Sequence, residues 1–324
     1  MYNLIVIIPT LNRPNVLYEI TLCSLVKQSY KDFKVIVWDA SDNNNTKNNV
    51  IKMKNKLNIE YIKANRRGLV SQRNDAVEYI LNSEKKCSHV LFLDDDVNLS
   101  NDAIEGLIRT FSTHSDTFGF GIPIINSKIS QGIYEFLKQI IRSLFFLFKF
   151  KKRHLTKYVY AYYTKPNEAN GLKVNWLTGA SMAYSIEVFR NISFDERLQT
   201  FGGYSLGEDI LFSHKVFMNY GWMVLSDYGS LEHILYESGR LNIYNMTSSL
   251  YYNMNLIFNE INLKSNKIKK QIFKLLFFWS MLYKKIVILR KSIRQNQIGE
   301  YFQGRKRALN RIRHEKKDNS TFKE

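Results

Sequence analysis

Three adjacent carboxylates close an apolar run, V-L-F-L-D-D-D-V, at residues 90–97. Alternate side chains of a strand point the same way, so we expect Asp94 and Asp96 on one side and Asp95 on the other. Two carboxylates that converge on one space form an oxygen site suited to Mg²⁺ or Mn²⁺. Such an ion can neutralise the charge that develops on a departing diphosphate. The alternative is a helix that begins at Ser100, whose N-terminus would favour nearby acids.

Polar residues also follow other apolar runs. Asp39 ends V-I-V-W-D, where it can accept hydrogen bonds from a ribose or a base, or form a turn with the following S-D-N-N-N. Arg13 and Arg73 follow two further runs and can grip a phosphate through two N–H groups, although each alone is also typical of a surface arginine. These three residues are therefore candidates for binding an anionic, nucleotide-like ligand.

A second group of candidates lies in the later part of the chain. Glu208 and Asp209 open a predicted helix after a glycine, so they suit either a general base or charge complementarity with the helix dipole. Gly179, in W-L-T-G-A-S-M-A-Y, either lets the backbone approach a ligand closely or marks a tight hairpin. His233 follows the run W-M-V-L-S and is either a third metal ligand or a structural histidine.

Strands are needed to bring these residues together. Up to about residue 110, apolar β-rich runs alternate with stretches of helical periodicity, which predicts βαβ units and an α/β fold with a mostly parallel sheet. The runs are L-I-V-I-I, F-K-V-I-V-W, I-E-Y-I and V-L-F-L. Residues 118–124 and 174–184 are predicted to add further strands. Ligands of such sheets bind beyond the carboxyl ends of the strands, so we expect the candidates along one rim.

Length and composition indicate a globular protein with a negatively charged partner. The chain has 324 residues, of which 45% are hydrophobic, enough for one large domain or two modest ones. Its 47 Lys and Arg residues against 29 Asp and Glu give a formal charge of +18. Such a charge indicates nucleic acid, an anionic membrane surface or a phosphorylated substrate as the partner.

Cysteine usage and the N-terminus indicate the cytoplasm. Cys23 and Cys87 show no spacing typical of a disulfide framework, which favours a reducing compartment. The start, M-Y-N-L-I-V-I-I-P-T, lacks a basic region and has only a short apolar run before Pro9. It therefore predicts a buried strand rather than a signal peptide.

Two segments combine apolar and basic residues at helical spacing. One covers about 132–153 and the other Ile268–Leu289, and both are too short or too often interrupted by charge to span a membrane. We interpret them as interfacial helices on an anionic membrane, or alternatively as core helices with a solvated basic face. The chain beyond residue 290 is predicted to be helical or disordered. The aromatic residues expected at the interface are Phe145, Phe146, Phe148, Phe277, Phe278 and Trp279.

In their order and separation, the motifs resemble those of family 2 glycosyltransferases, which have the nucleotide-sugar-binding GT-A fold. The matching segments, within about residues 3–240, are I-I-P-T-L-N-R, V-W-D-A-S, R-N-D-A, F-L-D-D-D-V, W-L-T-G-A-S-M-A-Y, G-E-D at 207–209 and His233. The resemblance implies a GT-A domain over 1–243, with a nucleotide-binding half at 1–115 and an acceptor-binding half at 116–243. A basic amphipathic helical region is expected at 244–324.

The resemblance also implies an inverting transfer of a sugar from a nucleoside diphosphate donor. By this likeness Asp209 would be the general base, Glu208 would orient it or the acceptor, and Asp96 and His233 would hold Mn²⁺ or Mg²⁺. Asp94 would face the ribose. The residues implied in nucleotide-sugar binding are Pro9, Thr10, Arg13, Asp39, Arg73, Asp94 and Asp95. Those implied in acceptor or sugar binding are Trp176, Thr178 and Gly179.

The expected acceptor is a hydroxyl of a glycan or lipid-linked sugar, in the assembly of a bacterial surface polysaccharide or lipopolysaccharide at the inner face of the cell membrane. No Gln/Arg-x-x-Arg-Trp motif follows Asp209, which favours single addition over polymerisation. A nucleotidyltransferase, which would release pyrophosphate, is a second possibility. A basic nucleic-acid-binding protein is a third, but it lacks a recognisable reading motif, so nucleic acid is not the expected partner.

Overall fold

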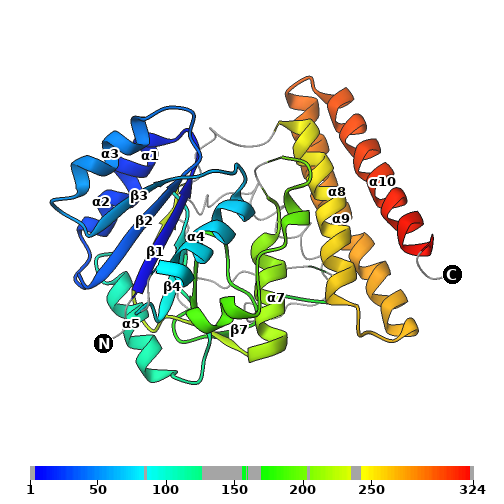
Figure 1. The fold of residues 1–324 in the computed structure, drawn as a ribbon. Helices are drawn as coiled ribbons and strands as arrows, with labels where there is room; N and C mark the ends of the chain where they lie inside the picture. Colours follow the sequence, from blue (N-terminus) through cyan, green and yellow to red (C-terminus); the bar gives the residue numbers. More distant parts are fainter. Residues whose placement is uncertain are drawn as a thin grey trace, which may run out of the picture.

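A computed structural model describes residues 4–83, 86–125, 155–157, 159, 169–202, 205–234 and 242–321 of the chain. At its centre is an eight-stranded sheet of order β3-β2-β1-β4-β8-β6-β9-β7 (Figure 1). All of its strands except β7 and β8 run in the same direction, which confirms the predicted mostly parallel α/β sheet. The strands are β1 Leu4–Thr10, β2 Phe33–Asp39, β3 Ile59–Lys63, β4 His89–Leu93, β6 Gly119–Gly121, β7 Lys173–Val174, β8 Ser181–Ser185 and β9 Met223–Leu225.

The apolar runs form strands because they are covered on both faces. β1 is buried along its whole length, as a central strand of a parallel sheet must be. Its alternate residues enter two different hydrophobic clusters, with Leu4 and Val6 in one and Ile5 and Ile7 in the other. At its end Thr10 is in register with Asp39 of β2, so the carboxyl ends of the two strands reach the same rim.

Helices supply the cover on each face. The first cluster contains residues of η1, α2, α3 and α5, and the second contains residues of α4 and α7. These elements are α1 Pro14–Val16, the π-helix η1 Leu17–Leu22, α2 Cys23–Val26, α3 Asn45–Met53, α4 Leu69–Ser83, α5 Ala103–Thr113 and α7 Glu208–Tyr220. Two short 3₁₀-helices, η3 Ile186–Arg190 and η4 Glu196–Gln199, precede α7.

A turn and a short strand follow the three aspartates. β5, Val97–Leu99, pairs with β10, Leu231–His233, in a separate two-stranded sheet. The predicted helix is present as α5, but it begins at Ala103, three residues later than expected from Ser100. The aspartates therefore do not owe their position to a helix N-terminus. The pairing of Val97 with His233 instead brings the distant histidine beside them.

Three helices in the described part of the chain follow the sheet, namely α8 Ile243–Ile261, α9 Lys267–Arg294 and α10 Ile298–Thr321 (Figure 1). α8 packs against α7, η4 and α10, which joins this region to the sheet. A third hydrophobic cluster forms between them and includes Leu211 of α7, Trp176 and Tyr252. The helical C-terminal region that the sequence predicts is thus present.

α9 has one packed face and one exposed face. Met281 and Ile288 are buried, and the ring of Phe277 stacks on Phe258 at 4.6 Å, so Phe277 belongs to the packed face rather than to an interface with a membrane. Phe278 and Trp279 are 61% and 44% exposed. Among the described helices, none has the length and apolar character of a membrane span. The predicted amphipathic segment at 132–153 lies outside the described residues.

Candidate active site

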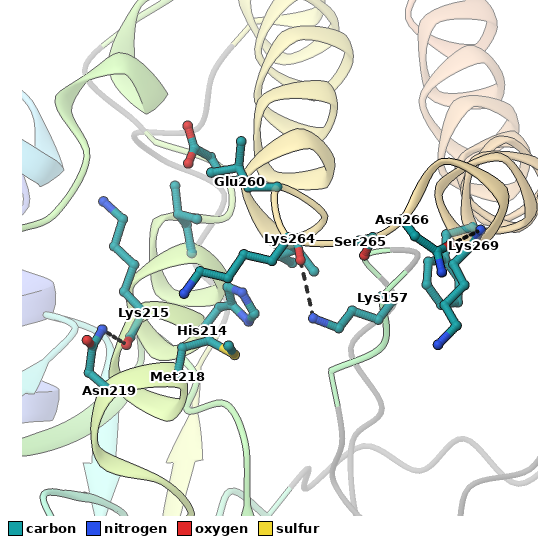
Figure 2. A pocket seen from close by; sticks show the side chains of 14 residues that line it. Lys157, His214, Lys215, Met218, Asn219, Glu260, Lys264, Ser265, Asn266 and Lys269 are labelled. Carbon is teal, nitrogen blue, oxygen red and sulfur yellow. Dashed lines mark hydrogen bonds between the residues drawn. The ribbon is translucent and has the colours of Figure 1, made fainter.

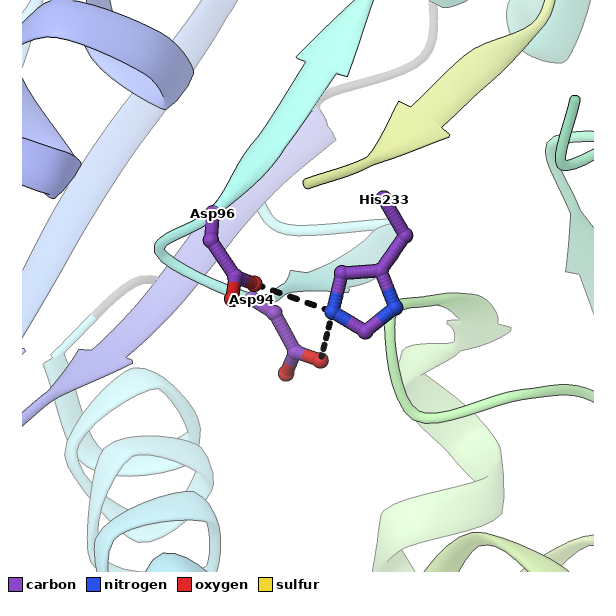
Figure 3. A group of neighbouring side chains, drawn as sticks. All are labelled: Asp94, Asp96 and His233. Carbon is purple, nitrogen blue, oxygen red and sulfur yellow. Dashed lines mark hydrogen bonds and ion pairs between the residues drawn. The ribbon is translucent and has the colours of Figure 1, made fainter. Parts of the chain in front are cut away.

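Asp94, Asp96 and His233 form a compact group at the rim of the sheet (Figure 3). Each side chain offers one ligand atom, and these three atoms all lie within 4.8 Å of one another. His233 Nε2 is 3.0 Å from Asp96 Oδ1 and 3.7 Å from Asp94 Oδ2. The predicted convergence of Asp94 and Asp96 is therefore found, although both lie in the turn after β4 rather than in the strand itself.

Hydrogen bonds to the backbone hold this turn in place. The Thr21 hydroxyl accepts a hydrogen bond from the Val97 N–H at 3.1 Å and lies 3.3 Å from the Asp94 carbonyl oxygen, to which it can donate. On the other side, the Ile234 N–H donates to the Asp96 carbonyl at 2.9 Å. The geometry of the acidic turn is thus fixed from both η1 and β10, before any ligand is considered.

Asp95 points to a different set of partners. Its carboxylate accepts hydrogen bonds from the Thr10 hydroxyl and from Arg13 Nη1, each at 2.6 Å. Arg13 Nη2 also donates to Asp96 Oδ2 at 2.8 Å, so one guanidinium bridges two of the three aspartates. Burial raises the pKa of Asp95 to about 7, although Arg13 and Thr10 act in the opposite direction. Asp95 therefore links the end of β1 to the acidic turn.

The members of the group titrate differently from free side chains. Burial opposes ionisation of Asp96, but hydrogen bonds from His233 and Arg13 outweigh it and lower its pKa. Burial alone would lower the pKa of His233, but the hydrogen bond to Asp96 and the negative charge of Asp94 raise it. Burial and the neighbouring acids raise the pKa of Asp94, with Arg73 and His233 acting against them. A positive charge is therefore favoured at the centre of the group.

The donor set fits a divalent metal ion. Two carboxylate oxygens and one imidazole nitrogen face the same space, and their spread is close to that of ligands around one ion at bond lengths of roughly 2.1 Å. Carboxylates suit Mg²⁺ and Mn²⁺, whereas an imidazole ligand is more common for transition metals. The raised pKa of His233 means that the metal would compete with a proton for Nε2.

Asp209 lies at the first turn of α7 and is oriented by backbone N–H groups. The Gly179 N–H donates to Asp209 Oδ2 at 3.0 Å, and the Ile210 N–H lies 2.8 Å from Oδ1. Gly207, just before the helix, has φ +87°, a left-handed conformation that glycine adopts at little cost. Hydrogen bonds of this kind favour the ionised carboxylate. Asp209 is half-buried, so it can still meet a ligand.

Arg73 connects the acidic helix start to the acidic turn. It is fully buried, and its Nη1 is 2.9 Å from Glu208 Oε1, while its Nη2 is 3.5 Å from Asp94 Oδ1. Nη2 also donates to the Gly179 carbonyl at 3.2 Å. This placement favours positioning of the two acids over direct contact with a diphosphate. Burial and the charge of Asp209 raise the pKa of Glu208 to about 7, and Arg73 lowers it.

The backbone at Gly179 is closely packed against these side chains. A Cβ atom there would lie 3.2 Å from Glu208 Oε1 and 3.3 Å from Arg73 Nη2. The sequence predicted that a backbone would approach a ligand closely at Gly179. In the structure the backbone approaches Asp209, Glu208 and Arg73, within a tight turn closed by the hydrogen bond from Ser181 N to the Thr178 carbonyl, as the alternative interpretation of Gly179 predicted. Approach of a ligand to Gly179 stays a prediction.

Other predicted residues are covered by protein. Asp39 is fully buried, and its carboxylate accepts hydrogen bonds from the Ser41 N–H at 2.9 Å and the Tyr61 hydroxyl at 3.0 Å, which is the turn-forming alternative. Pro9 is buried within β1. Trp176 is 1% exposed in the cluster shared with α8, and Thr178 is 8% exposed. Contact of these residues with nucleotide or acceptor remains a prediction.

Lys284, on α9, is a site residue that sequence reasoning missed. Its Nζ lies 3.5 Å from Met254 Sδ. Burial lowers its pKa to about 8, and the negative charge of Asp209 acts in the opposite direction, so the two side chains interact electrostatically. The sequence around Lys284 resembles the rest of a basic helix, so no local pattern distinguishes it.

Comparisons with known proteins agree with this geometry. The family model described as glycosyl transferase family 2 matches residues 5–185. A search of curated sequences found no match. Among solved structures, TarS of S. aureus has 19% identity and a TM-score of 0.55, covering 85% of this chain, which spans only 43% of that one.

Two further structures contain ligands. A TarS fragment, residues 1–349 in complex with UDP-GlcNAc, has 17% identity and a TM-score of 0.54 over 94% of this chain and 90% of that one. GalNAc-T7 with UDP, GalNAc and Mn²⁺ has 15% identity and a TM-score of 0.56 over 78% and 48%. These likenesses establish the GT-A fold. Because the family model covers more than half of the sequence, the chain belongs to glycosyl transferase family 2 and is a glycosyltransferase.

Proposed function

We propose that the enzyme transfers a sugar, with inversion, from a nucleoside diphosphate donor to a hydroxyl of a glycan or lipid-linked acceptor. One observation carries the proposal: Arg73 ties the helix start that bears Asp209 to the turn that bears Asp94 and Asp96. A base and a site for a charged leaving group are thereby held at a fixed separation. Inversion by direct displacement requires these two parts and no protein nucleophile.

Each side chain has a defined task in this reaction. Asp209 removes the proton of the acceptor hydroxyl as its oxygen attacks the anomeric carbon, and the bond from that carbon to the diphosphate oxygen breaks. Glu208, held by Arg73, orients Asp209 or the acceptor, and the N–H groups of Gly179 and Ile210 hold the Asp209 carboxylate. Asp94, Asp96 and His233 would hold a divalent cation, which supplies charge stabilisation for the diphosphate. The electron pair of the broken bond leaves with the nucleoside diphosphate.

The donor and metal are proposed by likeness to the neighbouring structures. TarS is described with UDP-GlcNAc and with UDP, and GalNAc-T7 with UDP and Mn²⁺. A UDP-sugar is therefore the first donor to test. The imidazole of His233 supports Mn²⁺ over Mg²⁺ as the preferred ion. Membership in a glycosyltransferase family favours this function over the nucleotidyltransferase that the sequence also allowed.

The exposed face of α9 supports a place on the cytoplasmic face of the membrane, where an acceptor for a surface polysaccharide or lipopolysaccharide is built. Apolar side chains recur there at helical spacing and are each at least 44% exposed. Lysines flank them, and such a combination is typical of helices that lie on anionic lipid. We name this set the α9 stripe; it consists of Ile268, Ile272, Leu275, Phe278 and Trp279.

Substitution of the proposed base tests the reaction. In Asp209→Asn we expect transfer to fall by roughly 10²- to 10⁴-fold, while UDP-sugar and Mn²⁺ still raise the melting temperature as in the unchanged protein. Asp116→Asn, which removes an exposed acid after α5, is the matched control and should leave the rate unchanged. Ordinary turnover in Asp209→Asn would contradict the base, and release of pyrophosphate instead of a nucleoside diphosphate would contradict the reaction class.

A further inference from the structure

One lysine of the C-terminal helices lies on the packed face of α9. Met281 and Ile288 of this face are buried, and Lys284 follows the first by three residues and precedes the second by four. Residues at this spacing share one side of a helix, so the side chain of Lys284 enters the contact between α9 and α8. Its Nζ lies 3.5 Å from Sδ of Met254, on α8. Lys284 is therefore directed toward the protein interior.

Met254 connects this lysine to the start of α7. A Cβ atom at Gly207 would lie 2.8 Å from Met254 Cε, so the methionine packs directly against the residue that precedes Glu208 and Asp209. Its sulfur contacts Lys284, and its methyl group contacts Gly207. The ammonium group is thus separated by a single methionine side chain from the helix start that carries the proposed base.

The charge of Lys284 requires compensation because the group is removed from water. A thioether sulfur is a weak, uncharged acceptor, so Met254 does not provide it. Burial lowers the pKa of Lys284 to about 8, and among the described acids Asp209 acts in the opposite direction. The neighbouring Lys285 is directed elsewhere, with its ammonium group 4.7 Å from the centre of the Tyr251 ring. Lys284 is therefore protonated at pH 7, and its charge acts on Asp209.

Asp209 has two acidic neighbours that oppose its ionisation. Burial raises the pKa of Glu208 and of Asp94, and the negative charge of Asp209 adds to both effects, so the three carboxylates repel one another. Arg73 offsets part of this repulsion through its ion pairs with Glu208 and Asp94. A general base must be ionised before it can accept a proton. A second cation near Asp209 therefore favours the state that the proposed reaction requires.

Other lysines close to α7 are directed away from Asp209. A pocket of about 650 Å³ lies between α7 and the turn that joins α8 to α9, and Lys215 and Met218 are part of its wall (Figure 2). Lys215 is paired with Asp195 at 3.6 Å. Met218 follows Asp209 by nine residues, roughly two and a half helical turns, so this wall is on the opposite side of α7. The positive charge of this pocket does not replace that of Lys284.

We infer that Lys284 is a positioning residue that acts through Asp209, because its positive charge keeps the carboxylate ionised and able to accept the proton of the acceptor hydroxyl. The C-terminal helices then complete the active site, since α9 contributes the cation and α8 carries the methionine that contacts it. This inference rests on the proposed function, which takes Asp209 as the base. The interaction of the two side chains can be measured without any transfer.

The dependence of transfer on pH is the first test, in the variant Lys284→Met. Methionine has a similar length and no charge, so Asp209 should take up a proton at higher pH. With UDP-sugar and Mn²⁺ at saturation, we expect the acidic limb of kcat to move upward by about 0.5 to 1 pH unit. At a fixed pH within the limb, transfer should fall by about 3- to 10-fold, and above the limb by less than about twofold. Lys284→Arg should restore the limb.

A matched control and two other readouts make this test specific. Lys306→Met removes one positive charge from an exposed position of α10, so its acidic limb should equal that of the unchanged protein. Equal movement in both variants would show a response to net charge and overturn the inference. So would an unmoved limb with a lower melting temperature, which indicates a structural role. A higher KM for UDP-sugar with an unmoved limb would assign Lys284 to donor binding instead.

An NMR titration of the Asp209 carboxyl carbon separates this inference from the proposed function. The resonance is identified by its loss in Asp209→Asn, and the measurement needs neither donor nor acceptor. Its midpoint should lie at higher pH in Lys284→Met than in the unchanged protein. If the midpoint moves but no UDP-sugar is turned over, the proposed function fails and the interaction of Lys284 with Asp209 stands. If transfer is normal and the midpoint is unmoved, the inference is overturned and the proposed function stands.

Discussion

Charged residues of the same type have different surroundings in the two halves of the molecule. At the rim of the sheet Arg73 is fully buried and contacts Glu208 and Asp94, whereas on α10 the side chain of Arg311 is 54% exposed beside Glu315. Both arginines form ion pairs at 2.8 to 2.9 Å. Only the buried one is needed to compensate acids that have little access to water. Burial, and not the ion pair itself, therefore distinguishes a residue that organises the site from one on a solvated face.

Apolar residues show the reverse difference. The exposed large apolar side chains of the sheet region, such as Ile51 and Leu81, are scattered over separate elements, while the α9 stripe gathers five of them on one helix, each at least 44% exposed. A solvent-exposed isoleucine is ordinary, but a continuous row at helical spacing is typical of an interaction surface. The helical region thus combines exposed charge with exposed apolar surface, and the two regions should respond differently to matched substitutions.

The largest effect on stability is expected for Arg73→Met. Loss of the guanidinium leaves Glu208 and Asp94 without their shared cation, so the free energy of unfolding should fall by about 3 to 5 kcal/mol. Urea unfolding at pH 7, followed by tryptophan fluorescence and by circular dichroism, measures the change. A decrease below about 1 kcal/mol would show that the buried network is not a stabilising requirement.

The next largest effect on stability is expected from a fall in pH, through His89. This side chain stacks on Phe111 with ring centroids 3.9 Å apart. Burial lowers the pKa of His89 to about 4, against about 6.5 in an unfolded chain. Between these values the unfolded state binds a proton that the folded state does not, so stability decreases as the pH falls from 6.5 to 4. The contribution of His89 is up to about 3 kcal/mol.

The variant His89→Phe isolates this contribution. Phenylalanine can keep the stack on Phe111 but cannot bind a proton. The variant should therefore lose less stability between pH 6.5 and 4 than the unchanged protein does, and the difference should equal the contribution of His89. Other titrating groups act equally in both proteins and cancel in the difference. Parallel curves of stability against pH for the two proteins would contradict the shifted pKa of His89.

The α9 stripe is expected to give an intermediate effect on membrane binding. In Leu275→Ser/Phe278→Ser, less apolar area can enter the lipid, and binding to anionic vesicles in a flotation assay should weaken by roughly tenfold or more. Because both side chains are exposed, the stability of the protein should change by less than about 0.5 kcal/mol.

The sheet region offers a matched control for this assay. Ile51 and Leu81 are 50% and 42% exposed on α3 and α4, so Ile51→Ser/Leu81→Ser removes apolar surface outside the stripe. Its vesicle binding should equal that of the unchanged protein. Equal loss in both double variants would show that the stripe has no special role in membrane contact.

The smallest effect is expected for Arg311→Met. Arg311 and Glu315 are four residues apart on an exposed helix face, where such pairs contribute about 0.3 to 0.5 kcal/mol. Urea unfolding should therefore show a change several times smaller than for Arg73→Met. A cost comparable to that of Arg73→Met would mean that exposure does not separate the two regions.

The rim of the sheet could be predicted from the sequence because the patterns that define it are local. Apolar runs ending in acids define strands and their carboxyl ends, and register then follows from the parallel pairing of β1 with β2. His233 could be read from the sequence as a metal ligand or a structural histidine, and the resemblance favoured the ligand. It is 137 residues from Asp96 and meets it through the pairing of β5 with β10. Local patterns cannot foresee that pairing. They did predict the helix after the acidic turn, although it begins three residues later than expected, at Ala103.

Tertiary contacts also decide which candidate residues reach a ligand. Arg73, Asp39 and Trp176 were singled out for ligand binding, and the structure adds that all three are buried among other protein groups, so their contact with a ligand stays a prediction. Conversely, Lys284 interacts with Asp209 although nothing in its own segment distinguishes it. Sequence periodicity reports which face of an element is apolar, but not which polar group on the other face meets a distant partner.

The contact of α8 with Gly207 has a consequence for how such enzymes can be recombined. A Cβ atom at position 207 would lie 2.7 Å from Ile257 Cδ1 and 2.8 Å from Met254 Cε, so the residue just before the acidic helix start is shaped by the C-terminal helices. A chimera that joins this sheet domain to the helices of another enzyme would inherit a mismatched surface at that point. Exchange of the helical region between such enzymes would therefore require the loop before α7 to be exchanged with it.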